Sequence, residues 1–143
     1  METMFLGQFH GRLDAQGTFH LPPSLCAHLA AGMVLTRGLD KCLMLFPRQA
    51  WQELAHKVSG LSFTLPEARA LRRLLFAGAL YCLAEGEGHI TLPEELCAYA
   101  QIEGDLVLVG LGAYLEIWSP TTWGDTLVRV EAEVSSLAEE LAI

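Results

Sequence analysis

Positively charged residues are scarce in this sequence. Its 143 residues include nine Lys and Arg against seventeen Asp and Glu, which gives a formal net charge of −8 at pH 7. Cationic side chains bind phosphate by releasing counterions, so an acidic chain repels nucleic acid at long range. Any nucleic-acid function must therefore depend on a local concentration of positive charge.

Long apolar runs are also absent. The uncharged stretch 15–36 is interrupted by prolines, histidines and a glutamine, and the apolar stretch 74–84 is too short to span a bilayer. The first residues, METMFLGQFHGRLD, lack the basic start and apolar region of a secretory signal. Because 52% of the residues are hydrophobic, we expect one folded, cytoplasmic domain that makes no contact with a membrane.

The spacings that mark metal sites and catalytic sites are missing. Cys26, Cys42, Cys82 and Cys97 form no CxxC pair, so we expect buried thiols that act as small hydrophobes. The five histidines form no HxH or HExxH pattern, and the segment GEGHITLP lacks the Lys-Ser/Thr of a phosphate-binding loop. We therefore expect no metal, no cofactor, no small-molecule substrate and no catalytic residue, and we predict that the protein is not an enzyme.

What the sequence does contain is a repeat. LDAQGTFHLPPSLCA, which begins at Leu13, matches AEGEGHITLPEELCA, which begins at Ala84, so that Gly17 aligns with Gly88. After one inserted position in the second copy, the segment from 32 to 51 matches the segment from 104 to 123. Each copy is too small to close its own core, so the two copies must pack together.

Each copy predicts the same order of elements. An alternating strand ends near Leu13, a glycine-containing turn follows, and a short strand leads to Leu-Pro. Proline then opens a short helix, two strands joined by a turn come next, and a second proline-started helix closes the copy, with Ser119 as a candidate cap. The predicted units are a first repeat over 8–51, connecting helices over 52–79, a second repeat over 80–123 and a C-terminal helix over 124–143.

Two such halves can form a pseudo-symmetric α+β unit with flanking helices, whose paired hairpins face the same way. Paired hairpins on one side of a protein are the geometry of a β-ribbon that reads DNA.

The connecting segment and the C-terminal segment carry further patterns. The stretch from Thr64 to Glu67 has the pattern of a capping box with a proline inside it. The helix that follows is amphipathic, and one face is either a solvated basic face or a contact to the acidic surface of a partner chain; its residues are Arg69, Arg72, Arg73 and Phe76. Near the C-terminus an apolar seam of little more than two heptads favours packing against the rest of the chain over a free coiled coil.

Five blocks of the sequence run in register from about 4 to 123: MFLGQFHGRLDAQGTFHLP, LTRGLDKCLMLFPRQAW, ARALRRLLFAGA, ITLPEEL and LEIWSPTTW. Together these blocks resemble the MraZ family of bacterial transcriptional regulators. The resemblance implies two tandem AbrB-like swapped-hairpin repeats that form a small barrel-like unit. It also implies rings of several protomers and binding to direct repeats in the DNA upstream of the division and cell-wall operon, and hence association with the nucleoid.

The resemblance assigns DNA contacts to the turns. The family carries an Asp-x-Lys-Gly-Arg pattern ahead of Leu-Pro, in which the Lys and Arg contact DNA. In the first copy Asp14 and Gly17 match this pattern. Gln16 stands at its lysine place and Thr18 stands at its arginine place.

In the second copy only Gly88 matches the family pattern. Glu85 stands at the aspartate place, Glu87 at the lysine place and His89 at the arginine place. None of the four cationic places keeps a permanent positive charge, although Arg12 lies just before the first turn. The candidate DNA-binding residues are therefore Arg12, Asp14, Gln16, Gly17, Thr18, Glu85, Glu87, Gly88 and His89.

Two hypotheses follow from these substitutions. In the first, the chain is a DNA-binding regulator in which a ring multiplies weak contacts through effective concentration. In the second, it is a diverged ring-forming paralogue with weakened or lost DNA binding, which acts as a protein-assembly or interaction module.

Overall fold

The computed structural model describes residues 4–143, and its elements follow the predicted order in both copies. In the first half these are β1 (Gln8–Arg12), β2 (Thr18–His20), α1 (Pro23–Leu29), β3 (Met33–Arg37), a 3-10 turn (Leu39–Lys41), β4 (Leu43–Pro47), α2 (Arg48–Ser59) and α3 (Pro66–Ala77). In the second half they are β5 (Leu80–Cys82), β6 (His89–Thr91), α4 (Glu94–Ala100), β7 (Asp105–Gly110), β8 (Leu115–Trp118), α5 (Pro120–Glu133) and α6 (Ser135–Glu140).

The two copies exchange strands. A six-stranded sheet has the order β1-β7-β8-β4-β3-β5, so the first strand of each copy pairs with the third strand of the other copy. The strands β2 and β6 pair separately as a two-stranded ribbon. This pairing confirms the α+β fold of two tandem swapped halves. Over residues 4–143 the large sheet stays open, with β1 and β5 at its edges, so the barrel-like unit is not a closed barrel.

A pseudo-twofold axis relates the copies. Phe19 pairs with Ile90 at the centre of the β2–β6 ribbon, and these two residues hold equivalent places in the repeat. Met44 pairs with Glu116 between β4 and β8, and these two are equivalent as well. The axis therefore passes through both the ribbon and the middle of the large sheet.

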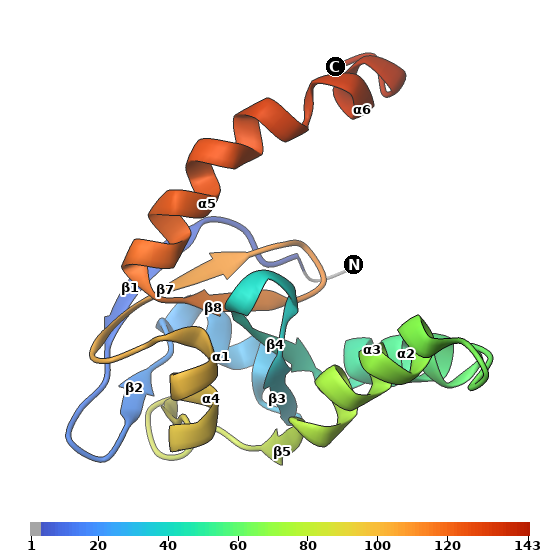
Figure 1. Ribbon diagram of the computed structural model, residues 1–143. Helices are drawn as coiled ribbons and strands as arrows, with labels where there is room; N and C mark the ends of the chain where they lie inside the picture. The colour runs from blue at the N-terminus through green and yellow to red at the C-terminus, as the bar shows by residue number, and fades with distance from the viewer. Residues whose placement is uncertain (1–3) are drawn as a thin grey trace.

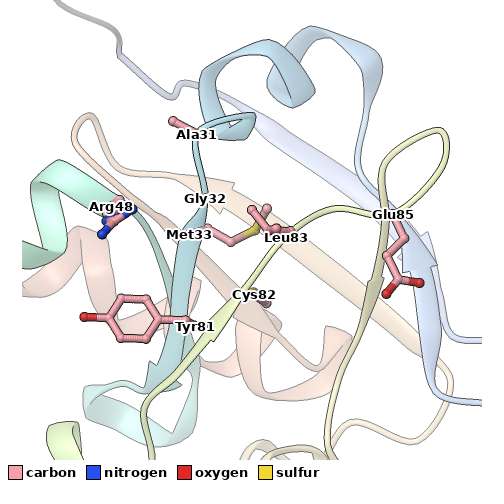
Figure 2. Close-up of a pocket in the computed structure, with 8 residues that line it drawn as sticks. All are labelled: Ala31, Gly32, Met33, Arg48, Tyr81, Cys82, Leu83 and Glu85. Atoms are coloured by element: carbon pink, nitrogen blue, oxygen red, sulfur yellow. The ribbon is translucent and has the colours of Figure 1, made fainter.

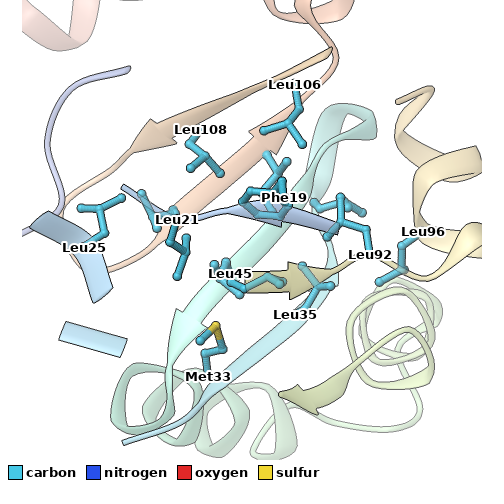
Figure 3. Close-up of a cluster of buried hydrophobic side chains, with 14 of the residues drawn as sticks. Phe19, Leu21, Leu25, Met33, Leu35, Leu45, Leu92, Leu96, Leu106 and Leu108 are labelled. Atoms are coloured by element: carbon cyan, nitrogen blue, oxygen red, sulfur yellow. The ribbon is translucent and has the colours of Figure 1, made fainter. Parts of the chain in front are cut away.

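The core lies between the ribbon and the large sheet. The inward side chains of the ribbon, Phe19 and Ile90, are 1% and 2% exposed, whereas His20 and His89 point to solvent. Leucines from the sheet, from α1 and α4 and from the Leu-Pro step after each ribbon strand fill the rest of this space (Figure 3); those labelled there are Leu21, Leu25, Leu35, Leu45, Leu92, Leu96, Leu106 and Leu108. Burial of each such side chain contributes roughly 1.5–3 kcal/mol, so the ribbon is held firmly over the sheet.

The capping box predicted before α3 is wrong. The residue before α3 is Leu65, whose side chain makes no capping hydrogen bond, and Thr64 instead bonds the Ser62 hydroxyl at 2.7 Å. Pro66 occupies the first turn of the helix, where its missing N–H costs no hydrogen bond. The capping box does not form because Thr64 lies one residue before the N-cap position, which Leu65 occupies.

The C-terminal seam does not pack against the rest of the chain. Helix α5 is attached at its start, where Trp123 lies against Trp118 with ring centroids 5.4 Å apart and Ser119 accepts a hydrogen bond from the Thr122 N–H. Beyond that point α5 and α6 project away from the body (Figure 1). The seam residues are 38–64% exposed: Leu127, Val130, Val134, Leu137 and Leu141. Among the described residues no helix is long and apolar enough to cross a membrane.

Candidate nucleic-acid interface

The candidate turns lie at the two ends of the β2–β6 ribbon. The first turn precedes β2, and the Gly17 carbonyl accepts a hydrogen bond from the Leu92 N–H at 2.9 Å. The second turn precedes β6, and the Gly88 carbonyl accepts one from the Leu21 N–H at 2.8 Å. A ribbon of three paired residues is about 10 Å long, so the two turns flank one short solvent-facing surface.

The first turn is organised by a carboxylate. Asp14 Oδ1 accepts hydrogen bonds from the backbone N–H groups of Gln16 and Thr18, both at 2.9 Å. The Gly17 N–H donates to the Asp14 carbonyl at 3.0 Å, and Gly17 has a φ of +78°, which favours glycine. The Asp14 side chain therefore holds the turn in shape, and the Gln16 side chain is left exposed at its tip.

The second turn lacks the side-chain support, and its backbone also differs, because Gly86 as well as Gly88 has a positive φ. The Glu85 and His89 backbones exchange hydrogen bonds of 3.0 and 2.8 Å, and the Gly88 N–H donates to the Glu85 carbonyl at 3.1 Å. The Glu85 carboxylate has no hydrogen-bond partner within residues 4–143. Gly88 has a φ of +98° and lies so close to Cys26 that an added Cβ would be 2.6 Å from its Sγ.

Two polar pairs occupy the solvent side of the ribbon. The Thr18 and Thr91 hydroxyls are hydrogen-bonded at 2.7 Å. His20 and His89 approach through their Nε2 atoms, with ring centroids 4.1 Å apart. Sequence analysis selected Thr18 and His89 but missed their partners, because only the antiparallel register places residues 18 and 20 opposite 91 and 89.

Arg12, the cation just before the first turn, is already paired. It donates to Asp105 at 2.7 Å, and both side chains are well exposed, at 74% and 63%. Asp105 begins β7, which is the exchange partner of β1, so this neutralising contact exists only because the copies swap strands. With Arg12 paired, the ribbon and its turns, which the structure describes in full, present no unpaired permanent cation.

Helix α3 uses most of its basic face within the chain. Arg69 donates to the Phe63 and Thr64 carbonyls at 3.0 and 3.1 Å, and Arg72 donates to the Ser59 and Leu61 carbonyls. Phe76 lies edge-on to Trp51, with centroids 5.7 Å apart. The three side chains thus tie α3 to α2 and to the connecting loop. Of the four candidate interface residues, Arg73 alone is exposed with no side-chain bond in the described chain.

The unpaired cations lie on helices and not on the ribbon. Arg37 donates to the Leu74 and Arg73 carbonyls, and Lys41 lies 4.8 Å above the Tyr99 ring. Within residues 4–143, the cations without a hydrogen bond, ion pair or ring contact are Arg48, Lys57, Arg73 and Arg129, on α2, α3 and α5.

A cavity of about 540 Å³ beside β5 has no catalytic arrangement. Arg48 and Tyr81 lie toward one end and Glu85 at the other, with Met33 and Leu83 between them (Figure 2). Its thiol belongs to Cys82, and burial raises the pKa of that thiol to about 11. At neutral pH such a thiol is protonated and a poor nucleophile.

The cysteines behave as packing residues. All four are free thiols, but the expected burial holds only for Cys42. Cys26, Cys82 and Cys97 are half-buried and pack against the edge of the core. The residues that the structure describes contain no group of three or more His, Cys, Asp or Glu side chains arranged to hold a metal.

Comparison with known proteins gives consistent matches over the whole fold. A family model described as MraZ protein matches the chain twice, over residues 4–74 and 75–142. A protein of Thermomicrobium roseum named "Transcriptional regulator MraZ" is 44% identical over 139 residues, which cover 97% of this chain and 98% of the relative. Proteins of the same name from Herpetosiphon aurantiacus and Roseiflexus castenholzii are 41% and 40% identical, and each comparison covers 97% of both chains.

Proposed function

The chain belongs to the MraZ family, and we propose from this that it is a sequence-specific DNA-binding transcriptional regulator and not an enzyme. Its targets are direct repeats upstream of the division and cell-wall operon, and it acts at the nucleoid. The observation that carries the proposal is the surface of the β2–β6 ribbon, which presents both turns to solvent over a rigid core.

Contacts through this surface are weak for each protomer. Gln16, Thr18, Glu87 and His89 stand where the family pattern has lysine or arginine. Each lost phosphate contact lowers by about 0.9 the salt slope, which is the steepness with which log affinity falls as log salt concentration rises. Arg12 remains available, because an exposed ion pair such as that with Asp105 contributes only ~0–1 kcal/mol and can be exchanged for a phosphate. Several protomers in one assembly would then multiply these contacts.

Self-association into a ring is part of the proposal. The apolar seam on α5 and α6 supports it, because this surface lies exposed along two consecutive helices of an isolated chain. Arg73, on α3, is a second candidate for a contact with a neighbouring protomer.

A salt-dependent binding assay tests the DNA proposal. We expect the full chain to shift a fragment from upstream of its own operon at low salt and to lose affinity steeply at moderate salt. Gln16→Lys with Thr18→Arg should raise affinity and steepen the salt slope by about 1.8 for each protomer in contact. The matched control Gln49→Lys with Gln52→Arg adds the same charge to exposed positions on α2 and should change the slope less.

The second candidate function is a protein-assembly module. It is favoured by the exposed seam and by the lack of an unpaired permanent cation among the described residues of the ribbon and its turns. A ring-sized oligomer that shifts no operon fragment, even at low salt, would favour this candidate and contradict DNA binding.

A further inference from the structure

The His20–His89 pair lies on the solvent side of the ribbon, close to its pseudo-twofold axis. The two residues are directly opposite each other in the antiparallel register, both side chains are exposed, and their Nε2 atoms face each other. The Nδ1 edge of His89 lies on the other side of its ring, 4.0 Å from where a Cβ on Gly86 would be. Each ring therefore presents the same nitrogen to one point in solvent.

Two converging imidazole nitrogens are good ligands for particular metal ions. Imidazole suits Zn²⁺, Cu²⁺ and Ni²⁺, whereas Mg²⁺ and Ca²⁺ prefer oxygen ligands. Tetrahedral Zn²⁺ at about 2.0–2.1 Å from each nitrogen holds two nitrogens about 3.3 Å apart. Rings whose centroids are 4.1 Å apart reach this separation by a small rotation of exposed side chains.

The charge around the pair also favours a cation. Asp14, Glu85 and Glu87 lie in the two turns that flank the ribbon, and Arg12 is neutralised by Asp105. The described turns thus carry three carboxylates with no unpaired cation, which lowers the cost of placing positive charge at this surface.

We infer that His20 and His89 together bind one transition-metal ion of the Zn²⁺, Cu²⁺ or Ni²⁺ class. The ion replaces the hydrogen bond between the rings: the ring that donates through Nε2 moves that proton to Nδ1 by a change of tautomer, both Nε2 atoms then bind the ion, and water completes the coordination shell. Its charge adds to the surface that faces DNA, so bound metal strengthens DNA binding; this second step rests on the proposed function.

Metal binding is tested without DNA on the full, untagged chain. Calorimetric titration with ZnCl₂ and Cu²⁺ electron paramagnetic resonance should detect one ion per protomer with two nitrogen ligands. His20→Gln and His89→Gln should each weaken Zn²⁺ binding by at least tenfold, whereas His10→Gln, at an exposed position on β1, should not. Zn²⁺ should raise the thermal midpoint of the parent chain and of His10→Gln, but not of the other two variants. Equal Zn²⁺ affinity in all four proteins would overturn the site.

DNA binding is then measured with Zn²⁺ and with EDTA. Zn²⁺ should raise the affinity of the parent chain for an operon fragment several-fold and leave His20→Gln unchanged. If Zn²⁺ binds through the two histidines but DNA affinity does not move, the coupling is overturned. If no DNA binds under either condition, the proposed function fails, and the calorimetric result still decides the metal site.

Discussion

The two turns of the ribbon are joined to the fold in the same way but differ in what holds their shape. Both place glycine at a positive φ and bond its carbonyl to the opposite copy. In the first turn the Asp14 carboxylate accepts two backbone N–H groups, whereas the Glu85 carboxylate accepts none in the described chain. In the second turn Cys26 fills the space beside Gly88. The first turn is therefore held by side-chain hydrogen bonds, whereas the second is held by a backbone hydrogen bond from His89 to Glu85 and by packing against Cys26.

The fold needs only part of each repeat. The glycine, the Leu-Pro step and the strand exchange are built into the core in both copies. The exposed side chains at the tips, Gln16 and Glu87, make no hydrogen bond within the described chain, so these side chains can change without loss of structure.

The largest effect is expected at Gly88. Gly88→Ala forces a side chain onto a φ of +98° and against Cys26 Sγ, and should lower the free energy of unfolding by about 3 kcal/mol. Gly17→Ala meets the Leu92 carbonyl at 3.2 Å and should cost about 1–2 kcal/mol. Urea unfolding followed by circular dichroism measures both. In a Cys26→Ala background the cost of Gly88→Ala should fall toward that of Gly17→Ala; an unchanged cost would show that packing against Cys26 is not what distinguishes the turns.

A smaller effect is expected at the carboxylates. Asp14→Ala removes the acceptor of two backbone hydrogen bonds and should destabilise the chain by about 1 kcal/mol. The stability of Asp14→Asn should lie between that of the parent chain and that of Asp14→Ala. Glu85→Ala should change stability by less than about 0.5 kcal/mol. Thermal unfolding of the three variants measures this difference. Equal losses at both positions would contradict the distinction between the turns.

The smallest effect is expected in the large sheet, at the point where the pseudo-twofold axis passes between β4 and β8. There Met44 of the first copy pairs with Glu116 of the second. Burial raises the pKa of Glu116, against the lowering effect of the hydrogen bond that Trp118 donates to it at 2.9 Å. Because the folded pKa exceeds the unfolded pKa, the folded state binds more protons, so this group's contribution to stability falls as pH rises from about 4.3 through the folded value.

Glu116→Gln should therefore slightly raise the free energy of unfolding at pH 7 and flatten its dependence on pH, since the amide oxygen can still accept from Trp118. Urea unfolding at pH 4, 5.5 and 7 measures this change, with the exposed Glu103→Gln as the control. A loss of stability at pH 7 would mean that the charged carboxylate, and not its shape, is needed beside Trp118.

Sequence reasoning succeeded where structure is local. Strand alternation, the Gly-containing turns and the proline-started helices were predicted correctly, because each is decided by a few neighbouring residues. It failed at Thr64, where a capping pattern lies one residue out of place, and on the C-terminal seam, where an apolar stripe has no partner within the described chain.

Only part of the candidate interface could be predicted from the sequence. The turns could be found from the repeat, and their missing cations from the resemblance to the family pattern. The pairing of Arg12 with Asp105 and of His20 with His89 could not, because these residues are 93 and 69 positions apart and meet only through strand exchange.

The amino-acid sequence alone determined that the chain folds as two similar halves with a glycine turn before each Leu-Pro, since short-range sterics and apolar periodicity decide these features. The tertiary structure decided which strands pair, which charges are neutralised and which histidines meet. Those choices depend on how two incomplete cores close against each other, and no local pattern specifies that.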